Sequence, residues 1–238
     1  MTATPTQARR VTLPVPRASV GRKLLVSLSG LFLVVFLLVH LGLNLILYLG
    51  PDAYNGAAHW MATHPAILAM RPILAVGVVL HVGFSVWLWA GNLRARPERY
   101  ARVDPAGGSS WAARNMLVLG VLVLLFLALH VSTFSLRLAF GAPPVTELSG
   151  VLVKDVYALV TSAFAVWWYS AIYVVAVLFL GLHLSHGVQS GLQTLGLSNA
   201  VWRRRWSCVG NLYAVAITAG FVSLPVFFFL QAQMGNAP

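Results

Sequence analysis

The sequence predicts an all-α integral membrane protein, a bundle of five transmembrane helices, on three observations. Of its 238 residues, 59% are hydrophobic and only 9% are charged, whereas soluble domains contain about 25% charged residues. Five apolar stretches are long enough to cross a hydrocarbon layer, which takes about 20 residues. Basic residues gather between alternate stretches. Because lipid-exposed strands leave backbone groups unpaired, the stretches are expected to be helices.

The expected spans follow one another with short breaks rich in Gly and Pro, such as Gly50-Pro51 and Pro143-Pro144. They cover approximately 24–50, 65–92, 113–140, 156–190 and 208–230. The fourth is long for one crossing and is expected to project beyond the bilayer. This division gives a polar cytoplasmic tail over 1–23, a transmembrane domain over 24–231 and a C-terminal tail over 232–238.

The distribution of Lys and Arg predicts the orientation of the chain in the cell (inner) membrane. Of the 16 basic residues, 13 lie in the N-terminal tail, between spans two and three, or between spans four and five. The other side has only Arg71, Arg137 and Lys154. The positive-inside rule then places the N-terminus in the cytoplasm and the C-terminus outside. It also explains the net charge of +11 without a nucleic-acid partner.

Histidines lie inside four of the five apolar spans, and span five has none. They are His40, His81, His130 and the pair His183 and His186. An ionisable residue within the membrane indicates function unless it only bonds a neighbouring helix, and four such spans weigh against that alternative. These spans have no Asp or Glu near the histidines, and the single cysteine excludes c-type haem attachment. Imidazole ligation of haem iron is therefore favoured.

Two of these histidines have matched depths near the outer face. His40 lies 11 residues before Pro51, and His130 lies 11 residues before Gly141. At the rise of an α-helix, each is roughly 16 Å from its outer break. The two histidines are therefore expected at one level, as two axial ligands of one iron must be.

The other histidines match in the same way nearer the inner face. His81 lies 13 residues before Arg94, and His183 lies 13 residues before Gly196, which is roughly 20 Å along each helix. His186 lies three residues from His183, on nearly the same helix face. Depth favours His183 over His186. Two pairs at two depths are what two stacked bis-histidine haems need.

With these motifs, the sequence resembles the five-helix di-haem cytochrome b membrane-anchor subunit of the succinate:quinone oxidoreductases, the succinate dehydrogenases and fumarate reductases. The resemblance covers nearly the whole chain from about Gly21. It is carried by the segments GRKLLVSLSGLFLVVFLLVHLGLNL, VLHVGFSVWLW, SSWAARNM with LVLLFLALH, and LHLSHGVQSGLQTLGLSN. The first and the last are the most specific.

The resemblance implies two haem b groups held by the same two pairs. His40 and His130 would be the iron ligands of the distal haem, near the outer face. His81 and His183 would be those of the proximal haem, near the cytoplasmic partner subunits. The family ligand in the last motif stands four residues before a glycine, as His183 stands before Gly187.

The resemblance also implies weaker contacts with the haem propionates. Ser27 or Ser29, Trp111 and Gln193 fall where family members make such contacts, although ordinary interfacial polar residues would occupy the same places. His186 is either an alternative ligand or a contact of a propionate or a quinone headgroup. Some relatives have a transmembrane glutamate two residues before the fourth ligand, for which this chain has Gly181. A proton pathway through that carboxylate is not carried over.

The function that the resemblance implies is electron transfer, with the succinate site in a partner. A flavoprotein subunit and an iron–sulfur subunit would pass electrons through both haems to or from a membrane quinone, with menaquinone favoured over ubiquinone. The aromatic residues Trp167, Trp168, Tyr169 and Tyr173 suit either a quinone site or an interfacial belt. Two other readings stay open: the cytochrome b anchor of a formate dehydrogenase or nitrate reductase, and a haem-free transporter or structural anchor.

Overall fold

The computed structural model describes residues 18–95 and 111–235. Its elements, in chain order, are α1 (Ala18–Leu45), the 3-10 turn η1 (Ile46–Leu49), α2 (Pro51–Thr63), α3 (Pro65–Ala95), α4 (Trp111–Arg114), α5 (Met116–His130), the π-helical segment η2 (Val131–Leu136), α6 (Arg137–Phe140), β1 (Val145–Leu148), β2 (Val151–Lys154), α7 (Val156–Phe164), α8 (Trp167–Thr194) and α9 (Ala200–Gln233). Residues 1–17 of the predicted tail and most of the basic segment after α3 lie outside this description.

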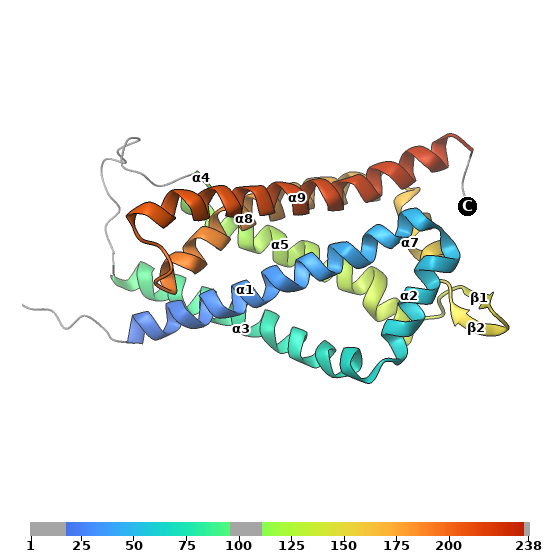
Figure 1. Cartoon of the computed structure of the whole chain (residues 1–238), viewed down its shortest axis with the longest axis horizontal. Coiled ribbons are helices and arrows are strands. Elements are labelled where there is room, and N and C mark those ends of the chain that lie inside the picture. Colours follow the sequence, from blue (N-terminus) through green and yellow to red (C-terminus); the bar gives the residue numbers. More distant parts are fainter. Residues whose placement is uncertain (1–17, 96–110, 236–238) are drawn as a thin grey trace, which may run out of the picture.

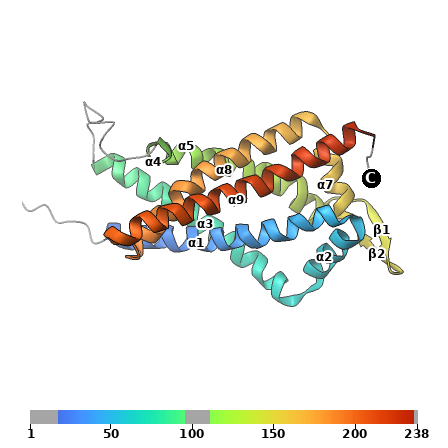
Figure 2. The same ribbon diagram turned by 45° about the horizontal axis from the view of Figure 1, so that its top comes forward.

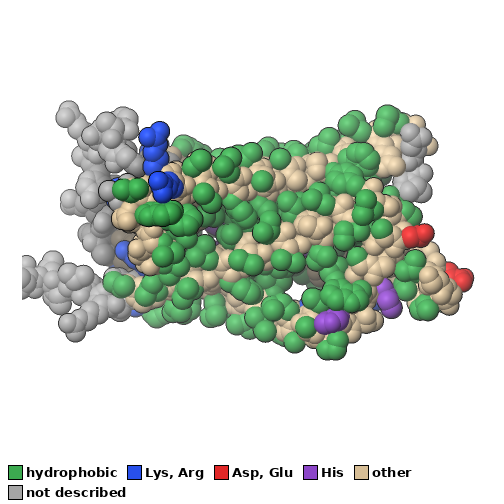
Figure 3. Space-filling model, in the orientation of Figure 1, with side chains coloured by type: hydrophobic (Ala, Val, Ile, Leu, Met, Phe, Trp, Pro, Cys, Tyr) green, Lys and Arg blue, Asp and Glu red, His purple; other side chains and the backbone are tan. Residues whose placement is uncertain are grey.

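Five long helical stretches confirm the predicted number of spans. By length and apolar composition, Val20–Leu49, Pro65–Arg94, Met116–Phe140, Trp167–Thr194 and Val201–Gln233 can each cross a membrane. They run side by side along the long axis of the molecule (Figures 1 and 2). Hydrophobic side chains cover most of the face in Figure 3, with Lys and Arg at one end and Asp and Glu at the other. The chain is a multi-pass membrane protein.

The fourth predicted span is not one helix. It consists of α7, which ends at Phe164, and the spanning helix α8, which begins at Trp167. Between them, Val166 adopts an extended conformation with φ −83° and ψ 116°. The Ser170 hydroxyl, at the start of α8, donates to the Phe164 carbonyl over 2.6 Å. The break therefore replaces the predicted projection of one long helix with a separate short outer helix.

Helix α9 begins earlier than the predicted fifth span. Its first turns include Arg203, Arg204 and Arg205, which were expected in a loop. The Asn199 side chain caps the helix by accepting from the Val201 and Trp202 N–H groups at 3.1 and 2.9 Å. A search for apolar stretches cannot detect these first turns, because many of their residues are polar.

The end of the bundle that was expected to lie outside, which we call the outer end, contains a cap that was not predicted from the sequence. Strands β1 and β2 form an antiparallel hairpin, with Leu148 opposite Val151. Ser149 and Gly150 join them with φ values of 52° and 79°, the positive pair that tight hairpin turns require. Helix α2 packs against the hairpin and α7. In that contact burial raises the pKa of Tyr54 to about 12, so the phenol stays neutral.

Small residues bring the spanning helices close together. A β-carbon on Gly210 of α9 would lie 3.3 Å from the Val188 side chain of α8, and one on Gly220 would lie 2.7 Å from Leu41 of α1. Such close approach is how helices associate in lipid, which offers little hydrophobic force between them. Helices α1, α8 and α9 thereby form the centre of the bundle, against which α3 and α5 hold their histidines.

Candidate functional site

The outer histidine pair joins α1 to α5. The ring centroids of His40 and His130 lie 5.7 Å apart, at an interplanar angle of 89°. Phe36 stacks on His40 with 5.2 Å between centroids, and Phe221 of α9 contacts the same ring at 5.6 Å. Aromatic side chains thus enclose the pair within the bundle.

The inner pair joins α3 to α8. The ring centroids of His81 and His183 lie 6.4 Å apart, at an interplanar angle of 79°. His183, rather than His186, is the ring that faces His81. The structure therefore brings together the same two pairs that matched depth suggested.

Helix α1 passes both histidine pairs and sets the spacing between their levels. A β-carbon on Gly30 would lie 3.1 Å from Cε1 of His81, so Gly30 marks the inner level. His40 stands ten residues further along the same helix, which is about 15 Å of helical rise. Across the inner pair, Gly120 of α5 would place a β-carbon 3.8 Å from Cε1 of His183. A glycine thus lies close to each ring of this pair.

The Nδ1 atoms of the inner pair have different environments. That of His81 lies 3.3 Å from the Val26 carbonyl oxygen and 3.3 Å from the Ser29 hydroxyl. That of His183 is buried and has no hydrogen-bond partner among the described residues. A buried polar atom without a partner is costly. His183 is therefore the ring that most needs a partner from outside the chain.

The outer pair has side-chain partners at both rings. Nδ1 of His130 lies 3.3 Å from the Tyr173 hydroxyl. Nδ1 of His40 lies 3.4 Å from the Asn44 amide nitrogen, which donates to the His40 carbonyl over 2.8 Å. Metal-ligating histidines commonly engage their second ring nitrogen with a carbonyl, carboxylate or water. The Nδ1 contacts of His81 and His130 leave Nε2 as the natural ligating atom.

A π-helical segment follows His130 directly. Val131–Leu136 carries Phe134, whose ring lies 5.4 Å from His130 and 6.2 Å from Tyr173. Single π-helical turns inside α-helices are frequent at functional sites. Here the extra residue in the turn places Phe134 beside the outer pair.

The geometry of both pairs fits axial ligation of haem iron. Two imidazoles that share a metal, each about 2.0–2.1 Å from it, hold their centroids roughly 6 Å apart. The observed 5.7 and 6.4 Å bracket that value. Across 18–95 and 111–235, no three His, Cys, Asp or Glu side chains cluster as a bare metal ion would need. Each pair offers two imidazoles, which is what an iron already held in a macrocycle would need from the protein.

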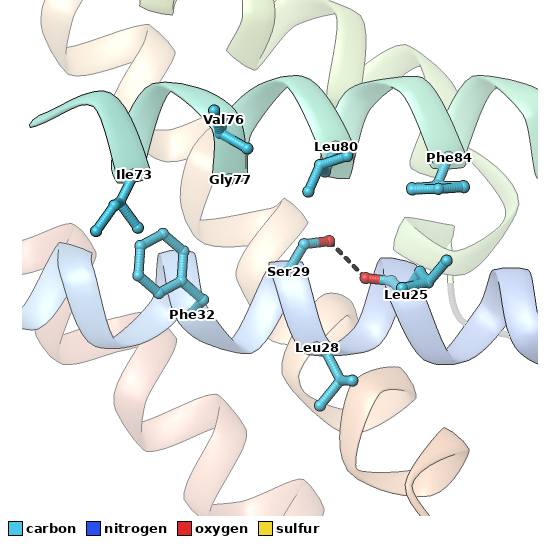
Figure 4. Close-up of a pocket in the computed structure, with 9 residues that line it drawn as sticks. All are labelled: Leu25, Leu28, Ser29, Phe32, Ile73, Val76, Gly77, Leu80 and Phe84. Carbon is cyan, nitrogen blue, oxygen red and sulfur yellow. Dashed lines mark hydrogen bonds between the residues drawn. The ribbon is translucent and has the colours of Figure 1, made fainter. Parts of the chain in front are cut away.

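The other predicted contact residues have varied settings. Ser29 lies beside His81 and donates to the Leu25 carbonyl over 2.7 Å, as Figure 4 shows. Ser27 is buried on α1, whereas Trp111 is 54% exposed and Gln193 is exposed in the last turn of α8. Only Ser29 contacts one of the four paired histidines.

An apolar groove runs between α1 and α3 beside the inner pair. Ser29 and Phe32 line it from α1, and Gly77, Leu80 and Phe84 are among the residues from α3 (Figure 4). A β-carbon on Gly77 would lie 2.7 Å from the Phe32 ring. The lining is almost wholly apolar, as suits lipid chains or the hydrocarbon part of a cofactor.

At Gly181, the position for which the resemblance raised the question of a glutamate, α8 is packed tightly against α9. A β-carbon there would overlap the Thr218 hydroxyl and lie 3.3 Å from Thr218 Cβ. The Thr218 side chain therefore occupies space that a larger residue at position 181 would need.

Comparison with known proteins finds a related sequence. Over 205 residues the chain is 26% identical to a protein of Bacillus subtilis (strain 168), the succinate dehydrogenase cytochrome b558 subunit. The chain resembles this cytochrome b subunit. The match covers 85% of the present chain and 92% of the relative, so the resemblance extends over most of both chains. No protein-family model and no solved structure matches the chain.

Sequence reasoning missed some neighbours of the four histidines. Gly30, Gly120 and Asn44 were not identified, and Tyr173 was considered only for a quinone site or an interfacial belt. A signal existed for Asn44, which stands one helical turn after His40. Tyr173 and His130 are far apart in the chain, so their contact depends on how α5 and α8 pack.

Proposed function

We propose that this protein is the di-haem cytochrome b membrane-anchor subunit of a succinate:quinone oxidoreductase. The main observation behind the proposal is that two pairs of imidazole rings lie at two levels of one bundle. They are His40 with His130 and His81 with His183. Similarity to the Bacillus subtilis subunit supports the succinate dehydrogenase part. The physiological direction is either succinate oxidation or fumarate reduction.

Haem b, held by two imidazoles at each level, supplies reversible one-electron chemistry. The chain's own residues supply ligands, spacing and burial. His81 and His183 would hold the proximal haem, and His40 and His130 the distal one. Because the chain offers two imidazoles at each level, the sites would leave no position open for oxygen and would favour electron transfer.

The partners follow from the two ends of the bundle. We propose that the Lys- and Arg-bearing end faces the cytoplasm and binds the iron–sulfur subunit, which connects to the flavoprotein subunit. Haems held at the proximal and distal levels would connect that end with a membrane quinone, to or from which electrons would pass, with menaquinone favoured. The opposite end, with Asp52, Glu147 and Asp155, would lie outside (Figure 3).

The test is to purify the intact complex and measure succinate-dependent reduction of a menaquinone analogue. We expect activity that His81→Ala abolishes, with the chain still assembled in the membrane. His59→Ala is the matched control, because His59 is exposed in α2 and lies outside the two pairs. Activity with formate or nitrate but not with succinate would refute the succinate assignment and leave the haem sites standing.

A further inference from the structure

We propose that Tyr173 positions His130 and lowers the reduction potential of the distal haem, with Tyr169 completing a hydroxyl chain. The inference rests on the proposed function, because it concerns a ligand of that haem. It concerns residues of α8 that have no ligand role of their own. Its basis is the contact between the Tyr173 hydroxyl and Nδ1 of His130. Nδ1 of His183 has no hydrogen-bond partner among the described residues.

The chain of contacts runs from one ring nitrogen through two hydroxyls. The Tyr173 hydroxyl lies 3.3 Å from Nδ1 of His130, and the Tyr169 hydroxyl donates to that of Tyr173 over 3.0 Å. Both tyrosines are buried, at 5% and 7% exposure. The two tyrosines are one turn apart on α8, so both hydroxyls lie on one face of that helix.

Ligation fixes the direction of the first hydrogen bond. An imidazole that gives Nε2 to iron keeps its proton on Nδ1 and donates it to a neighbour. The Tyr173 oxygen is the acceptor at hand. Accepting that proton makes the imidazole a more basic ligand, which stabilises the oxidised iron and lowers the potential. The hydrogen bond from Tyr169 orients the Tyr173 oxygen for this role.

The tyrosine rings are held independently of their hydroxyls. Tyr173 packs edge to face on Phe126 at 4.9 Å and on Phe164 at 5.2 Å. Phenylalanine at 173 keeps these ring contacts and loses only the hydroxyl. The substitution therefore removes the hydroxyl contacts with His130 and Tyr169 and keeps the ring packing that holds α8 in place.

The inner pair gives an internal comparison within the same protein. Nδ1 of His183 has no partner within the described residues, and Nδ1 of His81 faces a carbonyl and a serine. Loss of the Tyr173 hydroxyl should therefore change the reduction potential of one haem only. A general weakening of the helix packing would instead change the reduction potentials of both haems.

The experiment is a potentiometric titration of the purified complex, wild type and Tyr173→Phe, followed in the visible haem bands. We expect the distal component to become easier to reduce by about tenfold in its reduced-to-oxidised ratio, which is 59 mV for a one-electron couple. The proximal component should stay unchanged. Tyr169→Phe should give a smaller shift in the same direction. Tyr213→Phe, which removes a hydroxyl bonded to the Val34 carbonyl, is the matched control and should shift neither.

The outcomes separate this inference from the proposed function. Two haems whose potentials are unchanged in Tyr173→Phe would overturn the inference alone. Equal shifts of both haems would also overturn it, because they would indicate a general structural effect. A wild-type protein without haem would overturn the proposed function and the inference with it.

Discussion

A β-carbon added to Gly30 of α1 would lie 3.1 Å from Cε1 of the His81 ring on α3 and 3.4 Å from its Nδ1. The His81 ring occupies the space that any larger residue at position 30 would need. Gly30→Ala should therefore displace the ring and lower the proximal haem content of the purified protein. The helix itself should gain about 1 kcal/mol, because Ala is the better helix former.

The matched control is Gly42→Ala on the same helix, where a β-carbon meets nothing within 4 Å. It should retain both haems. If Gly30→Ala also retains both, with unchanged spectra, the close contact with His81 has no bearing on ligation.

Replacement of His81 by Ala should remove about half of the haem, because one of two axial ligand pairs is lost. Haem per polypeptide, from the pyridine haemochrome spectrum, checks this. His186→Ala is the comparison, because that ring does not face His81. It should keep both haems, whereas loss of about half the haem in His186→Ala would make His186 the ligand in place of His183.

Gly181→Ala should destabilise the contact between α8 and α9. The added carbon would overlap the Thr218 side chain, and overpacking of this kind costs about 1–3 kcal/mol. The apparent melting temperature in detergent should fall, and Thr218→Ala in the same chain should restore most of it. Gly187→Ala, whose β-carbon would meet only Met116 Cε at 3.6 Å, should change little. A fall of equal size at both glycines would contradict the packing argument.

Asn55→Ala should weaken the outer cap without affecting the haems. The Asn55 side chain is 2% exposed, donates to Asp155 Oδ1 over 2.9 Å and accepts from the Tyr157 N–H over 2.9 Å. Its removal leaves buried groups unpaired, at about 1–3 kcal/mol. The melting temperature should fall while the spectrum stays the same. Asn115→Ala removes an exposed hydrogen bond from the side-chain amide to the Trp111 carbonyl and should have a far smaller effect.

The number of spans and the proximity of the paired histidine rings could be predicted from the sequence, because both depend on distances along single helices. A helix rises uniformly, so the eleven-residue offsets of His40 and His130 from their outer breaks fix matched depths before any packing is known. The structure brings those two rings within contact.

The cap and the aromatic neighbours could not be predicted in the same way. The break at Val166 and the hairpin at Ser149-Gly150 interrupt or adjoin apolar runs without changing their hydropathy. The contact of Tyr173 with His130 depends on the rotation of α8 against α5, which no pattern within one helix encodes.

Haem stoichiometry of the purified full-length protein tests the central claim most directly. The measurement combines a reduced-minus-oxidised spectrum with haem b per polypeptide. The two imidazole pairs predict a b-type α-band and two haems, both with bis-histidine ligation. No α-band, or a single haem that persists in His81→Ala and is lost in both His40→Ala and His130→Ala, would contradict the two-site account.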